Sequence, residues 1–208
     1  MRVGILGGTF DPPHVGHLLV ASDAFEALHL DRIYFIPNAR QPLKTADAQS
    51  SPEDRMTMVR LATASDRRFV LEALEVERGG LSFTVDTIET LATRDPGHER
   101  FLLLGTDASR TFAQWRSPGR IAALATLALM RRSGATASEP SDADVVGQIV
   151  AATGPSVPPP VVVATRRVDV SSTEVRERVR TGLPLTGFVP EAVGRFIFDR
   201  GLYHTRQA

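Results

Sequence analysis

The sequence predicts an α/β fold: a doubly wound, Rossmann-like and mostly parallel sheet with a small C-terminal helical tail. Short apolar runs without polar alternation recur along the chain, which is the pattern of parallel strands covered on both faces. Helical patterns lie between these runs, as crossover connections between parallel strands require. Two further helical patterns close the chain and predict the tail.

Apolar runs bounded by Gly, Pro, Asn or Arg are interpreted as buried strands, because such residues are typical of the turns beside strands; the last run follows three prolines. They cover residues 2–6, 33–36, 101–104, 124–130 and 161–164. Helical spacing follows the first run, after Gly16, and a second helix is expected after the start signal Ser51-Pro52-Glu53.

The C-terminal part, 171–208, contains helical patterns over 172–180 and 190–200 and is expected to pack against the sheet edge. The stretch 133–160 is rich in Ala, Ser, Pro, Asp and Gly, with one weak helical patch near 145–151. It is interpreted as a surface excursion that is poorly ordered at its edges.

Length and composition limit the function classes. The 208 residues predict a single domain, 1–208. Equal numbers of basic and acidic residues, 24 each, leave no net field, so neither nucleic acid nor a membrane surface is an expected partner. The chain contains no cysteine, no apolar run of bilayer length and no signal-peptide pattern at its start. A cytoplasmic protein is therefore expected.

The first turn after a strand, residues 7–17, has the features of a phosphate cradle. Ligands of doubly wound sheets bind beyond the carboxyl ends of the strands. Gly7 and Gly8 let backbone N–H groups approach an anion, and the helix that begins near Gly16 points its positive end at the same place. The glycines do not follow G-x-G-x-x-G, and no Gly-Lys pair exists, so the dinucleotide fingerprint and the P-loop are both disfavoured.

His14 and His17 lie at this helix entry, where both rings can face one ligand. A metal site is an alternative interpretation, but no third ligand has suggestive spacing, and no protein metal site is predicted. The other histidines, His29, His98 and His204, are interpreted as structural.

A second motif, Ser171-Ser172-Thr173 followed by Arg176, begins the C-terminal helical pattern. Hydroxyl residues at a helix start are first of all N-caps. The same hydroxyls, the helix dipole and the arginine would also hold the far phosphates of a triphosphate. The two interpretations are compatible.

Together, GGTFDPPHVGH at 7–17 and SSTEVR at 171–176 resemble the nucleotidylyltransferase superfamily, whose marks are H-x-G-H and an S-[ST]-T-x-x-R-like sequence. Over nearly its whole length the chain looks like the bacterial nicotinate-nucleotide adenylyltransferases. The resemblance implies catalytic roles for His14, His17 and Arg176. It assigns ATP binding to Gly7, Gly8, Thr9, Phe10, His14, His17, Asp107, Ser171, Ser172, Thr173 and Arg176.

The resemblance also implies an acceptor site. The segment 78–87 is similar to the one whose backbone amides receive the nicotinate carboxylate, here at Phe83 and Thr84, and Trp115 falls where the family stacks an indole on the pyridine ring. The family often has P-P-H-K where this chain has Gln-Pro-Leu-Lys, so only Lys44 is carried over, as the contact to the acceptor phosphate.

Structural alternatives stand beside three of these assignments. Trp115 is also consistent with an ordinary partly buried aromatic residue. Asp107 and Thr84 are equally consistent with residues that cap the helical patterns after them.

The activity implied by the resemblance is transfer of AMP from ATP to nicotinate mononucleotide, giving deamido-NAD and pyrophosphate, with Mg²⁺ bound together with ATP. Pantetheine-phosphate adenylyltransferase would share both phosphate motifs. A nucleotide sensor without chemistry would keep the cradle, and a nicotinamide-dependent oxidoreductase is disfavoured by the glycine spacing. The sequence leaves the oligomeric state open.

Overall fold

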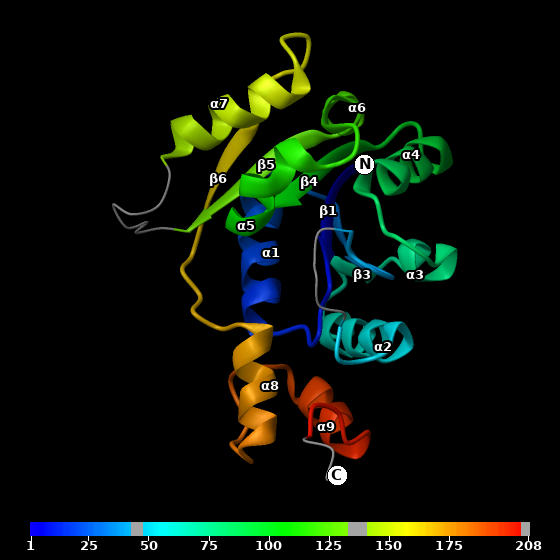
Figure 1. Cartoon of the computed structure of the whole chain (residues 1–208), viewed down its shortest axis with the longest axis vertical. Coiled ribbons are helices and arrows are strands. Elements are labelled where there is room, and N and C mark those ends of the chain that lie inside the picture. The colour runs from blue at the N-terminus through cyan, green and yellow to red at the C-terminus, as the bar shows by residue number, and fades with distance from the viewer. Residues whose placement is uncertain (43–47, 133–140, 205–208) are drawn as a thin grey trace.

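The computed structural model describes residues 1–42, 48–132 and 141–204, and its centre is a six-stranded sheet (Figure 1). The strand order is β3-β2-β1-β4-β5-β6, and every strand pair in the described residues is parallel. This confirms the predicted doubly wound fold. The strands are β1 (Arg2–Gly8), β2 (Arg32–Pro37), β3 (Phe69–Leu71), β4 (Glu99–Leu104), β5 (Thr126–Arg132) and β6 (Val161–Thr165).

Side chains of the inner strands, such as β2 and β4, alternate between two buried faces, which explains the continuous apolar runs of the sequence. On β2, Ile33 and Phe35 belong to one core cluster, whereas Tyr34 and Ile36 belong to the other. The predicted run 124–130 begins too early, because Leu124 still belongs to a helix and β5 starts at Thr126.

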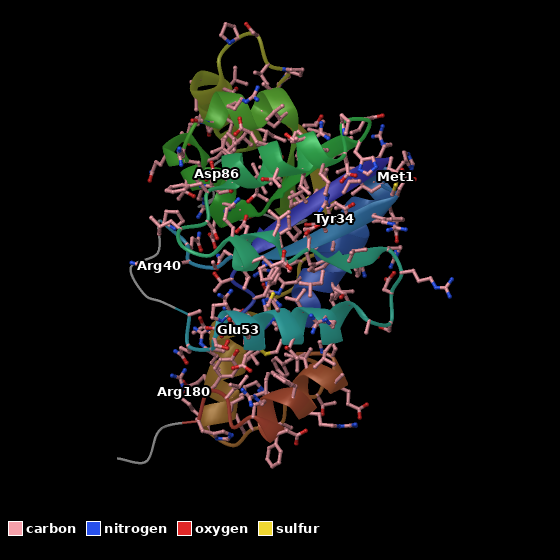
Figure 2. All side chains as sticks on the ribbon, turned by 90° about the vertical axis from the view of Figure 1, so that its right-hand side faces the viewer. Met1, Tyr34, Arg40, Glu53, Asp86 and Arg180 are labelled. Atoms are coloured by element: carbon pink, nitrogen blue, oxygen red, sulfur yellow. The ribbon has the colours of Figure 1, made fainter. Side chains whose placement is uncertain are left out.

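Helices cover both faces of the sheet. In Figure 2, Asp86 of α4 and Glu53 of α2 lie on opposite sides of Tyr34 in β2. No helix in the described residues is long and apolar enough to cross a membrane. The helices are α1 (Val15–Ala27), α2 (Pro52–Thr63), α3 (Leu74–Arg78), α4 (Thr84–Arg94), α5 (Thr106–Thr111), the 3-10 turn η1 (Phe112–Gln114), α6 (Pro118–Leu124), α7 (Asp142–Thr153), α8 (Ser172–Arg180) and α9 (Glu191–Asp199).

The stretch 133–160 is more regular than its composition predicts. Within its described part, α7 runs over twelve residues, and Ser141 caps it by accepting a hydrogen bond from the backbone N–H of Asp144 at 3.1 Å. Val145 and Ile149, one helical turn apart, are buried in a core cluster of the sheet. The helical patch predicted near 145–151 is therefore part of a longer helix, which connects β5 to β6 in the chain.

The C-terminal helices pack on α2 and not on an edge strand, which corrects the expected docking place. Met58 and Ala62 of α2 are buried in one apolar cluster with Val193 and Ile197 of α9. Val59, on another side of α2, is buried in a sheet cluster instead. Because α2 presents apolar side chains to two partners, it connects the tail to the sheet.

The strand order reverses between β1 and β4, and this is the point where doubly wound sheets bind ligands. Gly7 and Gly8 at the end of β1 are in register with Ile36 and Pro37 at the end of β2. The loops that leave these strands therefore start at one edge of the sheet, beside the first residues of α1.

Candidate active site

The two histidines of the first motif face each other at the start of α1, where His14 is the N-cap. Their ring centroids are 3.7 Å apart with an interplanar angle of 31°. The backbone N–H of His14 donates a hydrogen bond to Nδ1 of His17 at 3.1 Å. Because Nδ1 accepts, the neutral His17 ring carries its proton on Nε2, which is then a hydrogen-bond donor.

The surroundings of His17 hold its ring in the neutral form. Burial, and to a smaller extent the neighbouring His14, lower the pKa of His17 well below its usual value. A neutral imidazole donates one directed hydrogen bond and brings no net charge. The sequence placed both histidines on one ligand, and the structure brings the two rings together.

The loop between β1 and α1 is shaped by Phe10, whose φ of 50° lies in the left-handed region. Its ring packs edge-on against His17, with centroids 5.0 Å apart. It also fills the space beside Gly8, where an added Cβ would lie 3.0 Å from the ring. Gly7 is exposed, and a Cβ there would meet nothing within 4 Å, so a ligand can approach the backbone at this position.

The second motif meets the first at two consecutive loop carbonyls. Oγ of Ser172 donates to the carbonyl of Pro12 at 2.8 Å, and Nη1 of Arg176 donates to the carbonyl of Asp11 at 2.7 Å. Nη2 of Arg176 also donates to Oγ1 of Thr173 at 3.2 Å. Segments 160 residues apart in the sequence therefore form one site.

These contacts refine what the second motif does. Ser171 is the N-cap of α8 and accepts a hydrogen bond from the backbone N–H of Glu174 at 3.1 Å. The hydroxyl proton of Ser172 is given to a loop carbonyl and is not available for a phosphate. Nε of Arg176 is buried and has no hydrogen-bond partner among the described residues, so its guanidinium keeps a donor unused.

Asp11 lies at the centre of a buried network that the sequence analysis did not identify. Its carboxylate accepts hydrogen bonds from the Tyr203 hydroxyl at 2.7 Å and from the backbone N–H of Gln49 at 2.7 Å. It also accepts from the hydroxyl and, at 3.3 Å, the backbone N–H of Ser50. Two distant segments, 49–50 and the C-terminal end at Tyr203, are thus tied to the loop after β1. Asp11 lies inside the first motif and Tyr203 in the predicted C-terminal part, but nothing in the sequence paired them.

Arg55 of α2 is a second residue that sequence reasoning missed. Its side chain is almost completely buried, at 1% exposure. The guanidinium donates to the carbonyls of Thr9 at 2.9 Å, Asn38 at 2.7 Å and Ala39 at 3.0 Å. It thereby joins the loops that follow β1 and β2. One arginine among 23 carries no sequence signal that distinguishes it.

The predicted acceptor residues lie at the start of α4 and beside it. Phe83 is the N-cap of α4, Thr84 is its first residue, and no side chain caps the free amides of this helix start. The Arg116 guanidinium lies over the Phe83 ring, 5.0 Å from its centroid. Because Arg116 follows Trp115 in the sequence, this contact links the Trp115 region to the start of α4. A helix start without a capping side chain suits a carboxylate.

Trp115 is half-buried and packs against Phe112, with ring centroids 5.3 Å apart. Its Nε1 donates to Oγ1 of Thr111 at 3.3 Å, which fixes the orientation of the indole. Asp107 is exposed in the first turn of α5, beyond the end of β4. The caps of α4 and α5 are Phe83 and Gly105, so neither Thr84 nor Asp107 is itself a cap.

Lys44 lies outside the described residues. The chain that leads towards it runs beside the acceptor segment, because the backbone N–H of Ala39 donates to Oγ of Ser82 at 2.9 Å. The backbone N–H of Ser82 in turn donates to the carbonyl of Arg40 at 2.8 Å.

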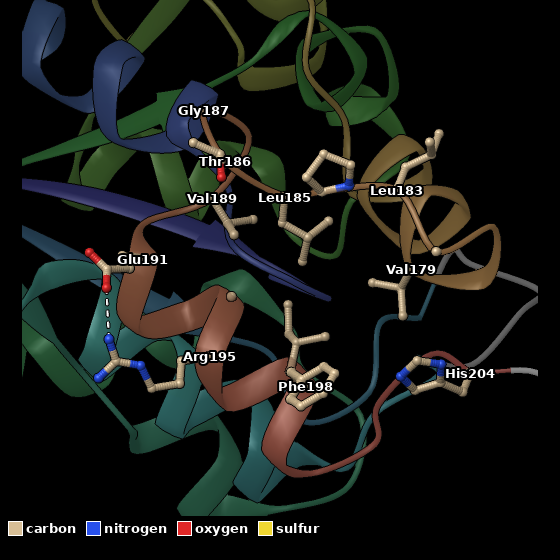
Figure 3. Close-up of a pocket in the computed structure, with 14 residues that line it drawn as sticks. Val179, Leu183, Leu185, Thr186, Gly187, Val189, Glu191, Arg195, Phe198 and His204 are labelled. Atoms are coloured by element: carbon tan, nitrogen blue, oxygen red, sulfur yellow. Dashed lines mark hydrogen bonds and ion pairs between the residues drawn. The ribbon is translucent and has the colours of Figure 1, made fainter.

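An apolar cavity of about 610 Å³ lies elsewhere, between the end of α8 and α9 (Figure 3). Leu183, Leu185 and Phe198 line it, and an ion pair between Arg195 and Glu191 lies at one side. None of the predicted site residues lines this cavity, so it is separate from the site described above.

The donor set can be compared with the needs of Mg²⁺. Among the described residues, no group of three or more His, Cys, Asp or Glu side chains could hold a metal ion. Mg²⁺ that accompanies a nucleotide needs no such cage, because phosphate oxygens and water supply most of its ligands. The site therefore fits a metal that arrives with the triphosphate.

Comparison with known proteins shows to which family the chain belongs. The family model described as cytidylyltransferase-like matches residues 5–178. A protein of Gemmatimonas aurantiaca named "Probable nicotinate-nucleotide adenylyltransferase" is 44% identical over 98% of this chain and 92% of its own length. A protein of Herpetosiphon aurantiacus with the same name is 39% identical, over 97% of this chain and 98% of its own length.

The fold is also found among solved structures. Nicotinic acid mononucleotide adenylyltransferase of Plasmodium falciparum, complexed with APC, has a TM-score of 0.75 at 15% identity and covers 97% of this chain and 96% of its own. Fold, paired phosphate motifs and family model define the chain as a nucleotidylyltransferase of the cytidylyltransferase-like class. Within that class, the full-length relatives show that it belongs to the nicotinate-nucleotide adenylyltransferase family.

Proposed function

We propose that this chain transfers AMP from ATP to nicotinate mononucleotide, releasing pyrophosphate and forming deamido-NAD. An oxygen of the acceptor phosphate forms a bond to the α-phosphorus of ATP. The bond from that phosphorus to the oxygen bridging the α- and β-phosphates breaks, and its electron pair leaves with pyrophosphate. The observation that carries this proposal is the meeting of both phosphate motifs at the Asp11 and Pro12 carbonyls, beside the switch point of the sheet.

Positioning and charge stabilisation would supply most of the acceleration. A phosphate monoester is largely dianionic at neutral pH, since its second pKa is about 6, so the reaction needs no general base. The backbone N–H groups of residues 7–10 and the Nε2 donor of His17 would bind the triphosphate, with His14 beside them.

At the other side of the triphosphate, the start of α8 would direct its dipole, and Arg176 its positive charge, at the leaving pyrophosphate. Thr173 would contribute a hydroxyl, and Asp107 would meet the nucleoside from the end of β4. Mg²⁺, when bound with ATP, would neutralise part of the phosphate charge; no residue described here is required to hold it alone.

The acceptor site would select an acid over an amide. The backbone N–H groups at Phe83 and Thr84 would receive the nicotinate carboxylate, Trp115 would stack on the pyridine ring, and Lys44 would meet the acceptor phosphate. A carboxamide would turn its own NH₂ towards these N–H donors, which leaves buried donors unpaired and weakens binding.

The test is pyrophosphate release from ATP and Mg²⁺ with nicotinate mononucleotide, nicotinamide mononucleotide or phosphopantetheine offered separately. We expect strong release with the first acceptor and weak release with the other two. Release only with another acceptor would keep the reaction type and refute the substrate. Absence of release with all three would refute the enzyme and favour a nucleotide sensor.

A further inference from the structure

The buried guanidinium of Arg55 donates hydrogen bonds to backbone carbonyls and forms no ion pair with a carboxylate of the described residues. Its partners are the backbone carbonyls of Thr9, Asn38 and Ala39, at 2.7 to 3.0 Å, and the side-chain amide oxygen of Asn38 at 3.4 Å; its Nε has no partner among the described residues. A buried cation of this kind is costly, and an apolar residue of similar volume would satisfy packing alone. What the arginine adds is control over the direction of three peptide groups.

The direction of the Thr9 carbonyl matters for the phosphate cradle. In a trans peptide the C=O and the following N–H point in opposite directions, because the group is planar. A Thr9 carbonyl held towards Arg55 therefore turns the N–H of Phe10 away from α2, to the opposite side of the loop. Phe10 has its ring against His17, so this N–H belongs to the same cradle as the histidine.

Two buried side chains of opposite charge, Arg55 and Asp11, fix the loop between β1 and α1 by hydrogen bonds. Arg55 donates hydrogen bonds to carbonyls of the loops after β1 and β2. Asp11 accepts hydrogen bonds from N–H and hydroxyl groups of residues 49, 50 and 203. Arg55 is the member that acts on the peptide between Thr9 and Phe10.

We propose that Arg55 is a positioning residue of this enzyme: its guanidinium fixes the peptide plane between Thr9 and Phe10, so that the Phe10 N–H faces the triphosphate together with His17. This inference rests on the proposed adenylyl transfer. It assigns to α2, an element outside both sequence motifs, a role in the geometry of the phosphate cradle.

The first test is Arg55→Lys, which keeps the charge and removes the planar fork. Arg100→Lys is a matched control, since Arg100 also donates to two backbone carbonyls, of Leu124 at 3.0 Å and Asp95 at 3.0 Å, but lies on β4 near its amino end. We expect kcat to fall about 10- to 100-fold in Arg55→Lys, as for other small displacements of binding groups. In Arg55→Lys the KM for nicotinate mononucleotide should change less than twofold. In Arg100→Lys the kcat should also change less than twofold.

A double-mutant cycle with His17→Ala separates positioning from general destabilisation. If both residues act on one cradle, Arg55→Lys should cost much less in kcat when His17 is already absent. Fully additive losses, or equal losses in Arg55→Lys and Arg100→Lys, would overturn the inference. Inactivity of the wild-type protein in the same assay would instead refute the proposed function.

A measurement on the wild-type protein tests the required geometry without relying on a folded variant. Addition of pyrophosphate should shift the backbone ¹⁵N–¹H signal of Phe10, whereas the signal of Ala39, whose N–H donates to Oγ of Ser82, should stay in place. An unmoved Phe10 signal, with pyrophosphate bound elsewhere on the protein, would overturn the inference even if Arg55→Lys were inactive.

Discussion

Removal of the Tyr203 hydroxyl should destabilise this protein measurably. In Tyr203→Phe the shape of the buried ring is kept, and the hydrogen bond of 2.7 Å to the Asp11 carboxylate is lost. The contact of 3.2 Å to Oγ of Ser50 is lost with it. A hydrogen bond to a charged group contributes about 1.5–3 kcal/mol, and for a chain of this size about 2 kcal/mol corresponds to a Tm lower by about 4–8 °C.

The stability difference should also depend on pH. Burial, together with the nearby Asp11, raises the pKa of Tyr203 above its usual value of about 10. Above that value the unfolded chain loses the proton while the folded protein retains it, so this group's stabilisation is lost as pH rises. The difference in unfolding free energy between wild type and Tyr203→Phe should therefore shrink by about 1.4 kcal/mol for each pH unit above about 10.

The assay is denaturant unfolding at neutral pH and at several pH values above 10, with Tyr34→Phe as control. Tyr34 is the other tyrosine, is 9% exposed, and its hydroxyl has no hydrogen bond to the described residues. The control should stay within about 0.5 kcal/mol of wild type. Equal stabilities of the two variants, or a Tyr203→Phe difference that does not change with pH, would refute the buried Asp11 network as an energetic link.

Three further predictions concern the residues of the proposed reaction. His17→Ala should lower kcat about 100- to 1000-fold, as loss of a transition-state donor does, with little change in Tm; near-normal turnover in a folded variant would contradict the role of His17. Because the pKa of His17 is lowered, its ring stays neutral between about pH 6 and 8, and kcat should show no step from its titration in this range. The stability that the neutral ring contributes to the folded protein should fall as pH drops below about 6.5, where the unfolded chain binds the proton. Trp115→Ala should raise the KM for nicotinate mononucleotide about 3- to 10-fold, from loss of aromatic stacking, and leave the KM for ATP unchanged. Phe198→Ala, at a side chain that is 77% exposed, is its control, and a parallel rise of both KM values in Trp115→Ala would argue against stacking on the pyridine ring.

The sequence predicted the fold well where burial is nearly complete. Strands such as β2 and β4 are covered on both faces, so they appear as continuous apolar runs that turn residues interrupt. It predicted less at β3, a three-residue edge strand too short for a pattern, and at α7. In α7 the Ala, Ser and Gly content weakens the helical pattern, because Val145 and Ile149 are the only deeply buried positions of this helix.

The chemical types of the candidate site were also present in the sequence by itself. A glycine-rich turn after a first strand, two histidines at a helix start and hydroxyls before Arg176 predict a polyphosphate site, because the chemistry of such a site is local. The sequence could not predict the hydrogen-bond partner of each side chain in this site. The Ser172 hydroxyl was expected on a phosphate, and only the folded chain shows that it donates to the Pro12 carbonyl.

Tertiary structure alone decided which residues support that site. Arg55 holds peptide groups 46, 17 and 16 positions away, and Tyr203 reaches Asp11 across 192 positions. Such pairs leave no periodic or local pattern, because nothing in one segment constrains the other until the sheet brings α2, the first loop and the tail together. The sequence thus determined which groups can meet a triphosphate, and the fold determined which buried charges hold those groups in place.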